Sequence, residues 1–127
     1  MPPEDDAWLI LQVALRHEAS LAAALDPAFP QENWGFLAQQ EVENLLKALI
    51  VLRDQLAPLS HDLHRLALQA QVHLPEELAE LQTFAVKARY SPGETPLPDS
   101  RARLLSLIQG LREWVELEIR AVAGAED

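Results

Sequence analysis

The fold is decided by the stretch QENWGFLAQQEVENLLKALIVLRDQL, residues 31–56. Its apolar residues recur at intervals of three and four, which is the spacing of one face of an α-helix. They are Trp34, Leu37, Ala38, Val42, Leu45, Leu46 and Leu49. This is the strongest helical pattern in the chain, and it predicts a long helix from about Gln31 to Leu56.

The same helix carries a second face that is not a plain solvent face. At about 100° per residue, Phe36, Gln40, Glu43 and Lys47 fall roughly opposite the Val42 side, and Ile50 and Val51 extend the apolar surface. One interpretation is a central helix with the core on one side and a polar cleft or second subunit on the other. The alternative is that Glu43 and Lys47, four residues apart, form an ordinary surface pair worth a few tenths of a kcal/mol.

Prolines and capping residues divide the rest of the chain into further helices. Pro27 and Pro30 end a first helix over about residues 5–25, because proline lacks an amide donor and restricts the residue before it. Ser60 is a suitable N-cap for a short helix over residues 60–70, and Pro75 suits the first turn of a helix over about residues 75–89. The proline-rich stretch 91–98 predicts a loop, and Asp99 or Ser100 can cap a long final helix.

No segment alternates with period two, so we predict no strand. The sequence therefore predicts an all-α fold, an antiparallel up-and-down helical bundle of about five helices, in one domain over residues 1–127. With 127 residues, of which 49% are hydrophobic, the chain has enough apolar surface for a single core without disulfides.

Composition limits the classes of function. The net charge of −10 repels phosphate backbones and argues against broad nucleic-acid binding. The chain has no cysteine, which excludes disulfides and thiol catalysis. No apolar run approaches the roughly 18 residues of a membrane span, and the N-terminus is acidic, so we expect a cytoplasmic protein with no membrane association. Phosphate-binding loops, nucleophile elbows and zinc-protease motifs do not occur.

His61 is the histidine best placed for chemistry, at the start of the helix expected over residues 60–70. A neutral imidazole can serve as a base or as a hydrogen-bond anchor. Asp62 is adjacent, but neighbouring residues on a helix do not face each other, so a His61–Asp62 dyad is not assumed. The alternative is that His61 only caps or packs against the helix end, where free amides need partners.

Arg89 and Tyr90 end the helix expected over residues 75–89, just before a rigid turn. An ordered guanidinium and phenol at this place can hold a phosphate or carboxylate. Alternatively, the cation complements the helix dipole and Tyr90 packs over the helix end. His61 and His64 are three residues apart, but such a pair is usually solvent-facing or packed, so we expect neither a metal site nor a cofactor.

These clusters together resemble the HEPN family of small helical domains, over nearly the whole chain from Trp8 to the last helix. The family has a Gln, a Glu and a Lys along a leucine-rich second helix, then His-Asp-Leu, then Arg-Tyr-Pro. The matching residues are Gln40, Glu43 and Lys47; His61, Asp62 and Leu63; and Arg89 and Tyr90, with Ser91 inserted before Pro92.

The resemblance implies a homodimer that binds nucleotides or partners a minimal nucleotidyltransferase, often in a toxin–antitoxin-like pair. The nucleotide-binding residues that it implies are Gln40, Glu43, Lys47, His61, Asp62, Arg89 and Tyr90. Among these, Lys47 and Arg89 would hold phosphate, and His61 would hydrogen-bond base, ribose or phosphate. Glu41 and Asn44 depart from the family pattern of alanine and lysine, which implies a more acidic helix face with weaker phosphate affinity.

Two other functions remain open. One is a metal-independent ribonuclease toxin, in which His61 takes the 2′-hydroxyl proton and Arg89 stabilises the phosphorane. Ribonucleases of this family carry an Arg followed by four to six residues and a His, whereas Arg53–His61 and Arg65–His73 each enclose seven. The other is a non-catalytic protein-interaction module, in which the polar residues only fix the bundle.

Overall fold

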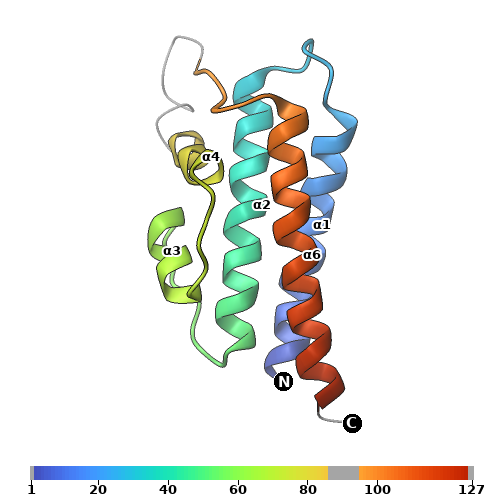
Figure 1. The fold of residues 1–127 in the computed structure, drawn as a ribbon, viewed down its shortest axis with the longest axis vertical. Helices are drawn as coiled ribbons and strands as arrows, with labels where there is room; N and C mark the ends of the chain where they lie inside the picture. The colour runs from blue at the N-terminus through green and yellow to red at the C-terminus, as the bar shows by residue number, and fades with distance from the viewer. Residues whose placement is uncertain (1, 86–94, 126–127) are drawn as a thin grey trace.

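The computed structural model describes residues 2–85 and 95–125, and every regular element in these ranges is helical (Figure 1). This confirms the all-α prediction. The elements are α1 (Pro3–Ala23), α2 (Gln31–Leu52), α3 (Leu63–Ala70), α4 (Glu76–Ala79), the 3₁₀ helix η1 (Glu80–Phe84) and α6 (Arg101–Ala125).

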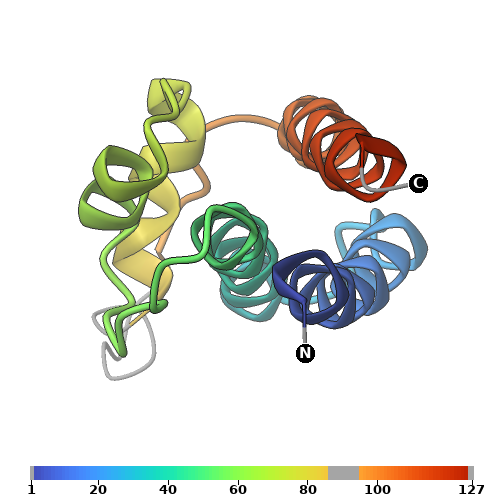
Figure 2. The same cartoon turned by 90° about the horizontal axis from the view of Figure 1, so that it is seen from below.

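Helix α2 is the central element of the bundle. Figure 2, which looks along the helices, shows α1 and α6 on one side of α2 and α3 and α4 on the other. The chain runs along α1, returns along α2, comes back through the segment that contains α3 and α4, and ends along α6 (Figure 1). The arrangement is the predicted up-and-down bundle, with short elements making up the third pass.

Both sides of α2 are buried within the chain, by α1 and α6 on one side and by the α3–η1 segment on the other. The whole predicted stripe of α2 except the half-buried Leu37 lies in the core, and so do Ala48 and Ile50. In α1, Leu11 and Ala14 are buried, whereas Ala22 is exposed. No helix in the described part of the chain has the length and apolar character that a membrane crossing needs.

The end of the bundle where α2 and α6 begin is tied together by side chains that bind backbone carbonyls. Trp34 Nε1 donates to the Leu21 carbonyl at 3.1 Å and so joins the start of α2 to the end of α1. Arg101 donates from Nη1 to the carbonyls of Ala24, at 2.9 Å, and Asp26, at 2.8 Å, and from Nη2 to that of Phe29. The first residue of α6 therefore holds the connection between α1 and α2.

Helix α2 ends at Leu52, four residues before the predicted Leu56. Asp54 adopts a left-handed conformation with φ 58°, which the periodic pattern does not reveal. Its amide donates to the Val51 carbonyl at 2.9 Å, and the Gln55 amide donates to the Ile50 carbonyl at 3.2 Å. These two bonds form a Schellman motif, which closes the helix without glycine.

The N-cap of α3 is Asp62, and the prediction of Ser60 was wrong. The Asp62 carboxylate accepts from the Arg65 amide at 3.2 Å, and Ser60 Oγ accepts from the Asp62 amide at 3.0 Å. Ser60 thus orders the turn that precedes the helix. At the start of α6, Ser100 Oγ accepts from the Arg103 amide at 3.1 Å, so the expected cap is present.

The helix expected over residues 75–89 is not a continuous α-helix in its described part. One α-helical turn, α4, passes directly into η1, because tertiary contacts fix this segment. Phe84 is fully buried against Gly35 of α2, so closely that a Cβ at Gly35 would lie 2.5 Å from the Phe84 ring. The Gln82 side chain accepts from the Leu63 amide at 2.6 Å. The more tightly wound 3₁₀ helix η1 carries both Phe84 and Gln82, which make these contacts.

Candidate functional site

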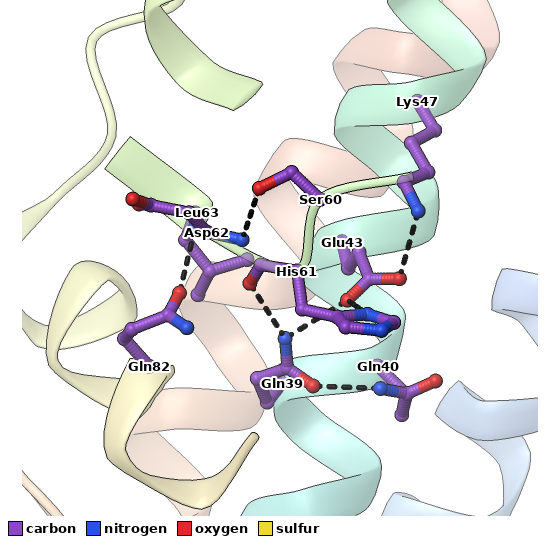
Figure 3. A network of polar contacts seen from close by, with 9 residues as sticks. All are labelled: Gln39, Gln40, Glu43, Lys47, Ser60, His61, Asp62, Leu63 and Gln82. Atoms are coloured by element: carbon purple, nitrogen blue, oxygen red, sulfur yellow. Dashed lines mark hydrogen bonds and ion pairs between the residues drawn. The ribbon is translucent and has the colours of Figure 1, made fainter. Parts of the chain in front are cut away.

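A buried carboxylate on α2 is the centre of a polar network (Figure 3). Glu43 Oε1 lies 2.8 Å from Nδ1 of His61, and Glu43 Oε2 accepts from Lys47 Nζ at 3.1 Å. The Glu43 side chain is 6% exposed, the Lys47 side chain 17% and the His61 side chain 61%. We call Gln39, Glu43, Lys47 and His61 the Glu43 cluster. Because its carboxylate is buried, the Glu43–Lys47 contact is not an ordinary surface pair.

Gln39 is the member of the cluster that the sequence reasoning missed. It is fully buried one turn before Glu43, and its Nε2 donates to Glu43 Oε1 at 3.1 Å and to the His61 carbonyl at 3.4 Å. Its Oε1 accepts from Gln40 Nε2 at 2.8 Å. A glutamine four residues before a buried glutamate on one helix was a usable signal, since such pairs are neighbours on the helix surface.

The turn between α2 and α3 places His61 over Glu43. Asp62 caps α3, and the Leu63 amide is held by Gln82. The His61 carbonyl is held from below by Gln39. Anchored on both sides, the turn presents the imidazole with its Nδ1 edge on Glu43 and most of its surface exposed.

The hydrogen bonds and nearby charge of Glu43 lower its pKa more than burial raises it. Burial raises the pKa of Glu43, but hydrogen bonds from His61, Gln39 and Lys47, together with the charge of Lys47, lower it below the ordinary value of 4.5. Glu43 is therefore a carboxylate in neutral solution. With Nδ1–H donating to Glu43, the neutral imidazole has Nε2 as its free acceptor.

The structure brings together four of the predicted site residues. They are Gln40, Glu43, Lys47 and His61. Asp62 lies beside them in sequence, but its carboxylate points away from the cluster in Figure 3 and caps α3 by accepting from the Arg65 amide. Arg89 and Tyr90, which were predicted to complete the site, lie outside the described residues.

Metal-ligating side chains do not gather in the described part of the chain. No group of three His, Asp or Glu residues with a metal-binding arrangement occurs in residues 2–85 and 95–125. His61 and His64 are both exposed, and His61 is paired with Glu43. The groups of the Glu43 cluster can transfer protons and form hydrogen bonds.

A second polar group lies between α1, α2 and α6. Arg112 of α6 donates two hydrogen bonds to Glu18 of α1, Nε to Oε1 at 3.1 Å and Nη2 to Oε2 at 3.0 Å. Glu41 of α2 is fully buried, and neither of its oxygens has a donor among the described residues. Burial first, and then Glu18, raise the pKa of Glu41 to about 10, against the opposing effect of Arg112.

Glu41 is therefore a neutral acid at pH 7, and its proton is the donor that a carboxyl–carboxylate hydrogen bond to Glu18 requires. This overturns one expectation. Glu41 does not make the face of α2 at the candidate site more acidic, because it points into the core and carries no charge. The sequence showed a glutamate among apolar residues, and only the packing of α1 and α6 gives it this environment.

The model of the HEPN domain matches residues 32–118 of this chain. That range includes all of α3, α4 and η1, nearly all of α2 and most of α6. It also includes every residue of the Glu43 cluster. The chain belongs to the HEPN domain family. The leucine-rich second helix and the His-Asp-Leu segment of this HEPN domain are the elements that build the cluster.

Curated relatives match over a shorter part of their own length. The HEPN chain is similar to part of "Bifunctional helicase and thymine dioxygenase JBP2" of Leishmania major, with 37% identity over 100 residues. The proteins of the same name from Leishmania infantum and Leishmania tarentolae are 36% identical over 100 residues. The match covers 76% of this chain but 9% of each of those proteins. No solved structure matches significantly.

Proposed function

We propose that this HEPN domain binds a nucleotide at the Glu43 cluster and acts as a dimeric, nucleotide-binding component of a two-protein system. The observation that carries the proposal is the single buried carboxylate that holds Lys47 on one oxygen and His61 on the other. An ammonium group has three donors, and Glu43 uses one of those on Lys47. The remaining donors of Lys47 are available to phosphate, and Nε2 of His61 can accept a hydrogen bond from a ribose hydroxyl or a base N–H.

The proposal extends to the residues and partners that family membership supports. Arg89 and Tyr90 would add a guanidinium and a phenol to the nucleotide-binding site. The partner would be a minimal nucleotidyltransferase, in a toxin–antitoxin-like pair, and the domain would be a homodimer. Co-expression with candidate nucleotidyltransferases and sedimentation of the purified chain test these two parts separately.

Titration with ATP and GTP tests the binding site itself. Lys47→Ala and His61→Ala should each weaken saturable binding by about tenfold, equivalent to ~1.4 kcal/mol. His64→Ala is the matched control, because His64 is exposed and lies on the solvent side of α3. Equal affinity in wild type, Lys47→Ala and His61→Ala, or no saturable binding at all, would contradict the nucleotide-binding role.

One observation favours a second function, metal-independent RNA cleavage. Glu43 holds Nδ1 of the largely exposed His61 and leaves Nε2 to act as a base, which is the arrangement by which a carboxylate orients a catalytic imidazole. End-labelled tRNA incubated without metal tests this. Cleavage that is lost in His61→Ala but kept in His64→Ala would establish a ribonuclease, and intact RNA would leave the binding role.

A further inference from the structure

A shallow apolar groove lies between α6 and the connection from α3 to α4, and it shares no residue with the Glu43 cluster. Its volume is about 450 Å³. It is lined by Gln71, Val72, His73 and Pro75 and by Leu107, Gly110, Leu111 and Trp114. The proposed function uses none of these residues.

Gly110 lines this groove, and the packing of the described residues does not require a glycine at this position. It lies inside α6, where glycine costs about 1 kcal/mol relative to alanine. A Cβ placed on Gly110 would meet nothing within 4 Å, so no contact among the described residues requires a glycine there. The glycine instead leaves room for a side chain that approaches from outside.

Large apolar side chains follow Gly110 along the same stripe of α6. Trp114 is one turn farther and 38% exposed, and Leu117 is 64% exposed. Residues at i, i+4 and i+7 share one face of a helix, so they continue the groove as an apolar track. An apolar track of this spacing fits a helix that lies along it, with its own apolar residues in the groove.

The rim of the groove is acidic. Glu76 follows the lining residue Pro75, Glu113 precedes Trp114, and Glu118 lies one turn beyond Trp114. No cation in residues 2–85 and 95–125 is within ion-pair distance of any of them. The nearby cations are committed elsewhere, since Arg112 binds Glu18 and Glu116, and Arg120 binds Glu116.

Basic side chains also occur along this face and determine where the groove is most acidic. His73 lines the groove, and the exposed Arg103 lies one turn before Leu107. The groove is thus acidic around Glu113 and Glu118 and less so toward the start of α6. The net charge of −10 adds a long-range attraction for cations at this face.

We propose that this groove binds a basic, amphipathic helical segment of another protein. Apolar residues of that segment would fill the space over Gly110 and contact Trp114, and its lysines or arginines would pair with the acidic rim. A second copy of this chain fits less well. A two-fold axis that placed each Trp114 over the other Gly110 would bring two Glu113 side chains together at the contact.

A synthetic helix-forming peptide with leucine at i, i+4 and i+7 and lysine elsewhere is the probe. We expect saturable binding by calorimetry, weaker by about tenfold or more in Gly110→Gln, which fills the groove with a good helix former. Gly124→Gln is the matched control, because Gly124 is also exposed in α6 and also has nothing within 4 Å of its Cβ position. Glu113→Gln with Glu118→Gln should weaken binding as well.

Each outcome decides for or against the basic partner. Binding lost in Gly110→Gln, kept in Gly124→Gln and absent for a peptide with glutamate in place of lysine supports it. No binding to the folded wild-type chain, or equal binding of both peptides, overturns it. Sedimentation supplies a further outcome: a wild-type dimer that Gly110→Gln converts to a monomer would show that the groove takes a second copy, and would also overturn the proposal.

Discussion

At Glu43, one carboxylate accepts hydrogen bonds from two segments of the chain, the preceding and following turns of α2 and the turn that carries His61. A buried carboxylate keeps its charge only when such donors surround it. The residue therefore has two roles at once. It fixes the turn before α3, and it orients the groups that we propose contact the nucleotide.

The ionisation of Glu43 predicts a stability that depends on pH. Because the pKa of Glu43 is lowered in the folded chain, the unfolded state binds the proton more readily, and stability falls as pH falls below about 4.5. Glu43→Gln should lose stability at pH 7 by about 1–3 kcal/mol and show a flatter acid limb. Urea unfolding between pH 3 and pH 7 measures both.

Glu113→Gln is the control for this experiment, because it removes an exposed carboxylate with no ion pair in the described part of the chain. It should follow the wild-type profile. If Glu43→Gln shows the same acid dependence as wild type, Glu43 does not carry the proton linkage that its hydrogen bonds imply.

The ionisation of Glu41 predicts the opposite pH dependence, with stability falling as the pH rises. Its pKa is raised to about 10 in the folded chain, so the unfolded state releases a proton that the folded state keeps. The stabilisation that this proton provides is fully present below about pH 4.5 and is lost as the pH rises toward 10. Glu41→Gln should therefore be about 1 kcal/mol or more stabler than wild type near pH 8, because the amide needs no proton from solvent.

Thermal unfolding from pH 5 to pH 10 checks this prediction. The difference between Glu41→Gln and wild type should grow with pH. A difference that stays constant, or a variant that is less stable at every pH, would mean that Glu41 is ionised and held by Arg112. The same Glu113→Gln variant reports the effect of removing one negative charge from the surface.

At the scale of elements, the joint between α2 and η1 depends on a glycine that allows a phenyl ring to approach the helix backbone. Gly35 is needed because of this contact, since the ring atoms of Phe84 occupy the place of a Cβ. The segment that follows α3 is thereby fixed against α2, and with it Gln82, which holds the Leu63 amide.

Gly35→Ala should destabilise the domain by about 1–3 kcal/mol, because the fully buried Phe84 must move. Gly110→Ala is the contrasting variant and should stabilise it by about 0.5–1 kcal/mol, since the new Cβ meets nothing and alanine is the better helix former. Chemical denaturation compares them. A neutral Gly35→Ala would show that η1 is not anchored through Phe84.

The ends of the elements show where sequence reasoning about helices stops. The apolar spacing predicted the interior of α2 correctly, but the helix ends at Leu52 because Asp54 and Gln55 close a Schellman motif. The change from α4 to η1 depends on two contacts between segments distant in sequence, that of Phe84 with Gly35 and that of Gln82 with the Leu63 amide. Neither end carries the glycine that usually marks a helix C-terminus in sequence.

At the scale of the whole molecule, net charge shapes which phosphate ligand the domain can hold. A chain of charge −10 repels an RNA strand over its whole length, whereas a mononucleotide meets only the local cations of the Glu43 cluster. The proposed site therefore suits a small ligand better than a long one.

This predicts an unusual salt dependence. A basic protein that contacts several phosphates gains roughly 10³-fold or more in affinity when salt falls from about 200 to 50 mM. Here we expect a change of no more than about threefold for a single-stranded RNA, because repulsion strengthens together with local attraction. Fluorescence titration at both salt concentrations tests this, with ATP as the short ligand. A steep increase for RNA alone would point to a local basic surface and to the ribonuclease function.

The sequence by itself determined the helical class, the core stripe of α2, and the residue types of the candidate site, because helical periodicity and capping are local properties. It also determined that Gln40, Glu43 and Lys47 share a side of one helix. Only the tertiary structure placed His61 on Glu43, 18 residues apart in the chain, and assigned Asp62 to a helix cap instead. It alone buried Glu41 as a neutral acid beside Glu18, because ionisation depends on which helices pack around a carboxyl group.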